Sequence, residues 1–194
     1  MADPDRRPRR TRATAGNPPP GARLRRALAL LSACLAALVL AACGSSASTG
    51  STTTSTASTT SASSLALAAY RGMWADLVTA ARTSDYQSAA LGDHATGAAL
   101  TLFVQGLARD QLHDIVTRGH VVLDPAVTSL TPSTDPDRAA VSDCVDDSEW
   151  IEYTTSGARA KNPAGGRRRT TAVVTRHSET WKVGELTVGA VGTC

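Results

Sequence analysis

Apolar positions divide the chain into three stretches with different patterns. An uncharged apolar run, Ala27–Leu40, follows a segment rich in arginine. Residues 45–64 are Ser, Thr and Ala with one Gly and no charge. Such a segment has too little apolar surface to form a core, so we expect a disordered linker. From Leu65 onward apolar residues recur, first at helical spacing and then in alternation, which predicts a folded domain of about 130 residues.

The first half of this domain has the pattern of helices. Apolar residues between positions 67 and 81 fall on one face at helical spacing. Asp85 is a suitable cap for a short second helix, Tyr86–Leu91. A third helix, Gly97–Arg118, is expected to end at Gly119, because glycine readily adopts the left-handed conformation.

The second half has the pattern of strands. The last two form a hairpin across the turn His177–Thr180. Helices followed by strands predict an α+β domain with its helices on one face of an antiparallel sheet. The expected strands are Val121–Leu123, Val127–Leu130, Ala139–Val145, Trp150–Thr155, Arg168–Arg176 and Trp181–Val188.

The N-terminal residues have the parts of a secretory signal: a basic segment, a short apolar segment and small residues. The apolar run closes with Leu40-Ala41-Ala42-Cys43, which resembles the lipobox of bacterial lipoproteins. In those proteins cleavage falls before the cysteine, a diacylglycerol is joined to its thiol, and its new amine is acylated, as with palmitate. The resemblance implies a lipid anchor at Cys43 on the extracytoplasmic face of the cell membrane. A transmembrane helix and a plain signal peptide are the alternatives.

Loss of the signal would reverse the sign of the net charge. The chain has 20 Lys and Arg against 17 Asp and Glu, a net charge of +3, but residues 1–43 hold eight Arg and two Asp. The remainder is therefore acidic, and we expect no nucleic-acid partner, which would call for a basic stripe on the folded domain. Arg167–Arg169, near Lys161, is either a patch for an anionic polymer or lipid headgroups or, as we favour, a solvated hairpin tip.

Three segments of the domain carry a resemblance to a known fold family. They are His94–Leu100, Val141–Asp146 and the closing Trp181–Val183. Together with the order of helices and strands, they resemble the nuclear transport factor 2-like superfamily, also called SnoaL-like or cystatin-like, and in particular its secreted or lipid-anchored actinobacterial members. The resemblance implies three N-terminal helices packed on a curved antiparallel sheet, in the shape of a cone. This superfold hosts isomerases, cyclases, hydrolases and non-catalytic modules, so it does not predict one function.

Enzymes of this family place an Asp, often helped by His or Tyr, inside the cone as a general base. Asp143 alternates with Val141 and Val145, so it shares their face of the strand, and a catalytic role would require its burial. Clusters of Asp are common in turns, however, and we favour a solvated Asp143 beside Asp146 and Asp147. The candidates that the resemblance suggests are Asp143, Asp124, His94, His177 and Tyr153.

No motif predicts a metal or a cofactor. The acidic residues between Asp143 and Glu149 lack the spacing of a calcium-binding loop. The four histidines show no paired ligand spacing, and no known catalytic motif is present. They are His94, His113, His120 and His177.

Four cysteines predict one disulfide. Cys34 lies in the apolar run and would leave with the signal, and Cys43 would carry the lipid. Cys144 and Cys194 remain, and they allow a single intramolecular pairing in an oxidising compartment. Two free thiols or an intermolecular bridge are the alternatives.

We therefore expect a signal peptide over residues 1–42, a linker over 43–64 that starts at the lipidated Cys43, and an α+β domain over 65–194. The function that we favour is a binding or accessory module of the cell envelope, whose partner is an envelope protein or a small apolar ligand. The alternative is an isomerase- or cyclase-like enzyme that uses the interior of the cone. An apolar cavity with a buried Asp or His would favour the enzyme, and a filled interior would favour the module.

Overall fold

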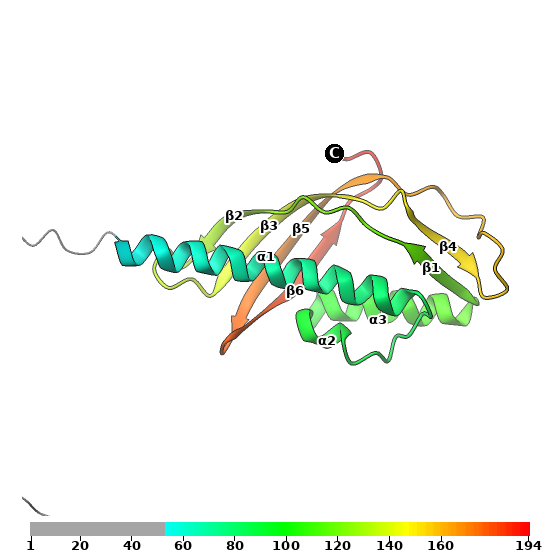
Figure 1. Cartoon of the computed structure of the whole chain (residues 1–194), viewed down its shortest axis with the longest axis horizontal. Helices are drawn as coiled ribbons and strands as arrows, with labels where there is room; N and C mark the ends of the chain where they lie inside the picture. Colours follow the sequence, from blue (N-terminus) through cyan, green and yellow to red (C-terminus); the bar gives the residue numbers. More distant parts are fainter. Residues whose placement is uncertain (1–52) are drawn as a thin grey trace, which may run out of the picture. The chain divides into compact units, whose positions relative to one another are not determined.

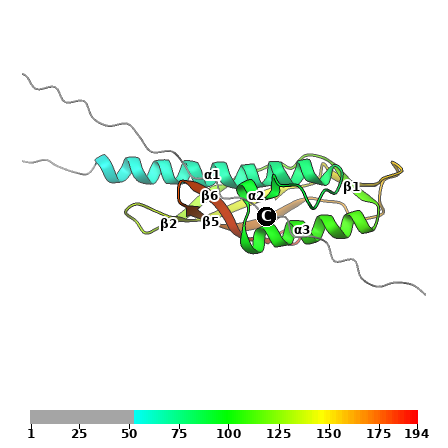
Figure 2. The same cartoon turned by 90° about the horizontal axis from the view of Figure 1, so that it is seen from below.

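The computed structural model describes residues 53–194, which form an α+β domain. Its helices are α1 (Thr53–Ala81), α2 (Leu91–His94) and α3 (Gly97–Leu112). Figures 1 and 2 show α1 and α3 on the same face of the main sheet, and α2 lies between them along the chain. The predicted α+β class, with its helices before its strands, is confirmed.

The strands form two antiparallel sheets. The main sheet has the order β2-β3-β5-β6, and a smaller sheet pairs β1 with β4. Ile115 is opposite Thr154 and Gly119 is opposite Trp150 in the small sheet. The expected hairpin of the last two strands is confirmed, since β5 and β6 pair up to His177 and Thr180. The bounds are β1 (Ile115–Gly119), β2 (Ala126–Thr131), β3 (Arg138–Asp146), β4 (Trp150–Thr154), β5 (Arg167–His177) and β6 (Thr180–Val188).

The core lies between α1, α3 and the inner face of the main sheet. Along β3 every second residue is buried, as expected for a strand with one face on a core. The same alternation continues in β5 and β6. Helix α1 contributes several large side chains to this core, among them Tyr70, Met73 and Trp74.

The folded domain begins earlier than the sequence predicts. Helix α1 starts at Thr53, and Ala62 is buried, so residues 53–64 are helical and not a disordered linker. Ala62, Ala66 and Ala69 are all buried at helical spacing. These small alanines pack α1 against the sheet, while Ser58, Thr60, Ser61 and Ser64 are exposed. The remainder of the predicted linker and the predicted signal lie outside the described residues.

The boundaries of the second and third helices also differ from the prediction. Helix α3 ends at Leu112, and Ile115–Gly119 forms β1 instead of a last helical turn. Asp114 has φ +56°, which breaks the helix, and the β-branched Ile115 favours the extended conformation that follows. Gly119 has φ +104°, and a Cβ there would lie 1.8 Å from the carbonyl oxygen of Glu149, so this glycine ends a strand.

Two further expectations are corrected. The second helix is Leu91–His94, whereas Tyr86–Leu91 is mostly turn, in which the carboxylate of Asp85 accepts a hydrogen bond from the N–H of Gln87. Val121–Leu123 is not a strand, and Val122 forms only an isolated bridge with Asp146.

Candidate functional site: a cavity between α1, α3 and β4

A cavity of about 400 Å³ lies where the C-terminal half of α1, helix α3 and strand β4 meet the loop 159–165. Trp74 and Leu77 of α1, Phe103 and Leu107 of α3, and Trp150 of β4 make an apolar and largely aromatic wall. The volume is at the lower end of the range for small-molecule sites. The domain therefore has a pocket, open to solvent on one side, that its own side chains do not fill.

The loop that covers one side of the cavity is fixed by carboxylates. The N–H of Gly166 donates to Oδ1 of Asp147 at 2.6 Å. The side-chain amide of Asn162 donates to Oε2 of Glu152, and the N–H of Ala160 donates to the carbonyl oxygen of Glu152 at 3.0 Å. A Cβ at position 165 would lie 2.3 Å from the carbonyl oxygen of Asp147, so only glycine fits there. The loop is thus a defined wall of the cavity.

Of the three carboxylates that line the cavity, Asp147 is paired with Arg168, and the other two come from different elements. Asp110 comes from α3 and Glu152 from β4. Burial raises the pKa of Asp110, while the nearby Arg109 and His113 lower it. Burial also raises the pKa of Glu152, the negative charge of Asp110 raises it further, and Arg109 lowers it. Both carboxylates are therefore poorly solvated and repel each other.

The arginines that line the cavity neutralise its carboxylates to different extents. Nε of Arg168 lies 3.0 Å from Oδ2 of Asp147, an ion pair whose angle is not that of a hydrogen bond. Nε of Arg109 lies 3.7 Å from Oδ1 of Asp110, and the Arg109 side chain is 72% exposed. Within residues 53–194, Glu152 has no cationic side chain within 4.0 Å. Among the three carboxylates of the wall, Glu152 is the least compensated.

Asp143 lies inside the domain, and the expectation that it is solvated is wrong. It is only 4% exposed, because the alternation of β3 turns it toward the core with Val141 and Val145. Its Oδ1 accepts a hydrogen bond from the N–H of Asp124 at 2.8 Å. Asp143 therefore has the burial that a catalytic role requires. It does not line the cavity, however, so a ligand in the cavity would not contact it.

Asp143 belongs to a buried polar cluster with Tyr70 and Trp74. Oδ2 of Asp143, the hydroxyl of Tyr70 and Nε1 of Trp74 are buried close together, although none of them makes a hydrogen bond of ordinary geometry. Burial raises the pKa of Tyr70 well above its ordinary value, the N–H of Trp74 lowers it, and the charge of Asp143 raises it. Because Trp74 also lines the cavity, this cluster lies directly behind the cavity wall.

The other predicted candidates lie outside the cavity lining. Nδ1 of His94 is 2.7 Å from Oδ2 of Asp76, which joins α2 to α1. The imidazole also packs on α1 at Gly72, where a Cβ would lie 2.6 Å from the ring. His94 therefore holds α2 against α1, which is a structural role.

His177, Tyr153 and Asp124 are each held elsewhere. Nε2 of His177 is 2.9 Å from Oγ1 of Thr175 at the exposed end of β5. The guanidinium of Arg118 lies 5.3 Å from the ring centroid of Tyr153. Asp124 is exposed, and it is its backbone that contacts Asp143. The structure does not bring these residues together.

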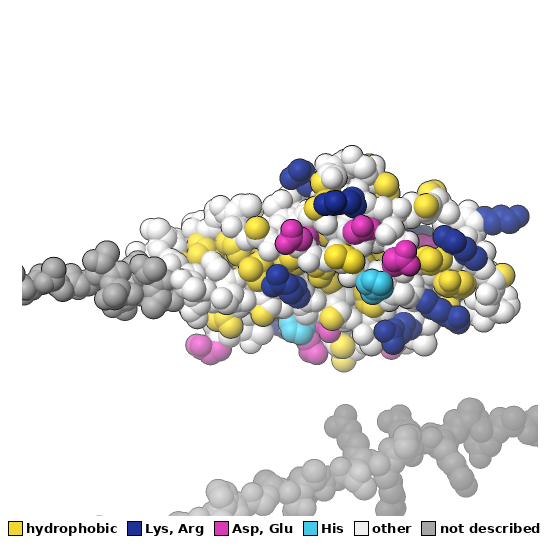
Figure 3. Space-filling view, turned by 45° about the horizontal axis from the view of Figure 1, so that its top comes forward, with side chains coloured by type: hydrophobic (Ala, Val, Ile, Leu, Met, Phe, Trp, Pro, Cys, Tyr) yellow, Lys and Arg dark blue, Asp and Glu magenta, His cyan; other side chains and the backbone are white. Residues whose placement is uncertain are grey.

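Neighbouring residues in the acidic run 143–149 and in the basic run Arg167–Arg169 have different partners and do not act as one group. Oδ1 of Asp146 accepts from the N–H of Ser148, whereas Asp147 pairs with Arg168. In the part of the chain that the structure describes, no group of three His, Cys, Asp or Glu residues is placed to hold a metal ion. Arg168 points to the cavity, whereas Arg167 and Arg169 are exposed, so the three arginines do not form one patch. Figure 3 shows basic and acidic side chains interspersed over the visible face.

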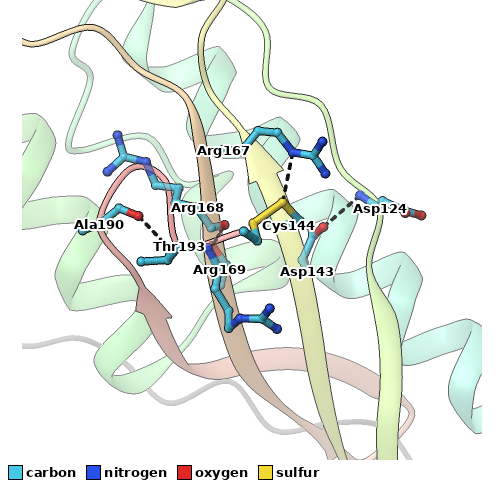
Figure 4. The surroundings of a disulfide bond; sticks show 10 residues. Asp124, Asp143, Cys144, Arg167, Arg168, Arg169, Ala190 and Thr193 are labelled. Carbon is cyan, nitrogen blue, oxygen red and sulfur yellow. Dashed lines mark hydrogen bonds between the residues drawn. A yellow bond between two sulfur atoms is a disulfide. The ribbon is translucent and has the colours of Figure 1, made fainter.

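The predicted disulfide between Cys144 and Cys194 is present, with the two Cα atoms 6.0 Å apart. Figure 4 shows the C-terminal segment beside β5, with Arg167 reaching back to the sulfur of Cys144. Nε of Arg167 donates to Sγ of Cys144 at 3.3 Å. The bridge fixes the chain terminus to β3.

The sequence analysis does not name Asp110, Trp150 or Glu152 as site residues, although their spacing carries part of the signal. Trp150 and Glu152 alternate in an expected strand, so a shared face could have been inferred. Asp110 follows Leu107 by three residues in α3, which places it beside the apolar face. That the two faces enclose one space depends on tertiary packing.

Comparison with known proteins gives little beyond this geometry. No protein-family model matches the chain, and no curated protein matches it. Among solved structures, the intermembrane space region of the chloroplast protein ARC6 is similar, with 18% sequence identity and a TM-score of 0.37. The match covers 61% of this chain and 92% of that chain. Within residues 53–194, no helix is both long enough and apolar enough to span a membrane.

Proposed function

We propose that this protein is a lipid-anchored, extracytoplasmic binding module of the cell envelope, and that its cavity holds a small molecule. The cavity of about 400 Å³ carries the proposal, since it combines an aromatic wall with a few polar groups. The export signal, the anchor at Cys43 and the cone-shaped nuclear transport factor 2-like fold are parts of the same proposal, and they rest on the sequence patterns.

The position of the cavity along α1 agrees with a role at a distance from the anchor. The chain enters the described domain at Thr53, and Trp74 in the cavity wall follows 21 residues later in the same helix. At a rise of 1.5 Å per residue the two positions are roughly 30 Å apart. Figure 1 shows the start of α1 and strand β4 at opposite ends of the domain. An anchor at Cys43 would thus leave the cavity free to face away from the membrane.

A neutral fluorescent naphthyl dye tests the binding function. We expect the full chain, in lipid nanodiscs, to bind one dye per molecule with saturable enhancement, after subtraction of empty nanodiscs. Gly106→Phe should abolish this binding, because Gly106 lines the cavity and a Cβ there has no atom within 4 Å. Gly92→Phe is the matched control, since Gly92 is also a helical glycine with open space but lies outside the cavity. Equal dye binding by both variants would overturn the proposal.

The carboxylate pair supports the second candidate, an isomerase- or cyclase-like enzyme. Asp110 and Glu152 line one apolar space with raised pKa values, as suits a general acid and base. An enzyme of this kind would exchange a substrate proton with solvent. Envelope extracts incubated with the protein in D₂O would then gain deuterium in a specific small molecule, with Glu152→Gln abolishing the exchange and Glu185→Gln retaining it. The binding function predicts no such exchange.

A further inference from the structure

The cavity wall also indicates the class of ligand. We propose that the occupant is a small organic cation, in which an apolar ring packs against the aromatic wall and an ammonium group lies against Glu152 and Asp110. This inference rests on the proposed binding function and specifies its ligand.

The uncompensated carboxylate is the first argument. Glu152 accepts a hydrogen bond from Asn162 and has no cationic side chain within 4.0 Å among residues 53–194. Among residues 53–194, the one ion pair of Asp110 is the 3.7 Å contact with the exposed Arg109. A carboxylate that is partly removed from water gains strongly from a charged hydrogen-bond donor. The cavity therefore offers an ammonium group two acceptors that the protein itself leaves poorly paired.

The aromatic wall is the second argument. Trp74, Phe103 and Trp150 line the same space as the two carboxylates. Trp150 and Glu152 are separated by one residue in β4, which places them on one face of the strand. Aromatic faces attract organic cations, most strongly when water is excluded. The ring and the charge of one ligand would thus be recognised by neighbouring parts of the wall.

An anionic ligand fits the wall less well. Arg168 is occupied by Asp147 at 3.0 Å, and Arg109 is directed largely to solvent. Arg159 belongs to the exposed part of the covering loop. An anion would in addition meet the negative charges of Asp110 and Glu152. Because Arg168 is already paired and Arg109 and Arg159 are exposed, Asp110 and Glu152 favour a cation in this space.

Three probes of similar shape test this selection by displacing the naphthyl dye. They are 2-naphthylethylammonium, 2-naphthylethanol and naphthylacetate, added to the full chain in nanodiscs at pH 7. We expect the ammonium to bind at least about tenfold more tightly than the alcohol, as one charge-assisted hydrogen bond provides. The carboxylate should bind most weakly. Glu152→Gln should remove most of the preference for the ammonium while binding of the alcohol is retained.

Glu185→Gln is the matched control, because Glu185 is an exposed carboxylate in β6 outside the cavity. It should keep the preference of the wild type. Equal affinity for ammonium and alcohol, or a preference that survives Glu152→Gln, would overturn the ligand class. Dye binding that is blocked by Gly106→Phe would still stand in that case, so a wrong ligand class and a wrong binding function give different results.

Discussion

Removal of the disulfide is expected to cost the domain a large part of its stability. Changing both Cys144 and Cys194 to Ser opens a loop of 50 residues. The chain-entropy model gives about 4 kcal/mol for a loop of this length, because the unfolded chain regains the freedom that the bridge had removed. For a domain of this size, that loss corresponds to a decrease of roughly 10 °C in Tm.

The hydrogen bonds of the C-terminal segment are too few and too exposed to replace the bridge, so we expect the double variant to lose most of this stability. The N–H of Gly189 donates to the carbonyl oxygen of Arg169 at 2.8 Å, and the N–H of Gly192 donates to that of Arg167 at 2.7 Å. The N–H of Arg169 donates to Oγ1 of Thr193 at 2.8 Å. These bonds lie in an exposed segment, so they should fray without the bridge, while the pairing of β3 with β5 persists.

Urea unfolding followed by tryptophan fluorescence measures this effect. The double variant should have a lower midpoint than the wild type, and added reductant should lower the wild type to the same value. The double variant itself should not respond to reductant. A free energy of unfolding within about 1 kcal/mol of the wild type, under non-reducing conditions, would refute the reasoning from loop closure.

Three further changes give separate tests. Asp143→Ala should cost roughly 1–3 kcal/mol in urea unfolding, because the N–H of Asp124 loses its buried acceptor, and Asp143→Asn should cost less; equal losses would argue against this hydrogen bond. The raised pKa values of Asp110 and Glu152 favour the folded state most below about pH 4, and this contribution is lost as the pH rises through those values. Glu152→Gln should therefore flatten the decrease in stability with rising pH, and an unchanged pH profile would contradict the assignment. Cys43→Ala should abolish labelling by a fatty-acid analogue in cells and release the protein from the membrane fraction or leave it unprocessed; labelling that persists would disprove the anchor.

The strands of the main sheet were predictable because their side chains alternate around a single core, whereas β1 was expected as the end of a helix. The run from Arg168 to Arg176 places Thr170, Ala172 and Val174 inward in alternation, and the structure has the same pattern. The disulfide was predictable by counting, since only Cys144 and Cys194 were left to pair. Local patterns of this kind are independent of how distant segments meet.

The start of α1 was missed because its buried face is made of alanine. Composition over residues 45–64 suggested disorder, whereas Ala62 packs into the core as part of a continuous helix. Asp143 was misjudged for a related reason, because the frequency of Asp in turns outweighed the alternation along the strand. In both cases tertiary packing overrides the local preference.

The cavity could not be read from the sequence. Asp110 and Glu152 are far apart in the chain and meet only because β4 pairs with β1 beside α3. Residues such as Trp74 and Phe103 have the spacing of ordinary core positions, and nothing in that spacing distinguishes a filled core from a cavity wall. Empty space is a property of how the elements fit together.

The most direct test of a ligand-binding cavity uses the indole N–H resonances of the protein. The chain has three tryptophans, of which Trp74 and Trp150 line the cavity, whereas Trp181 is buried elsewhere in the core. Titration of the full chain in nanodiscs with the neutral naphthyl dye should shift the resonances of Trp74 and Trp150 in a saturable manner, leave that of Trp181 unchanged, and have no effect in Gly106→Phe. Uniform shifts of all three resonances, or none, would contradict the cavity as the binding site.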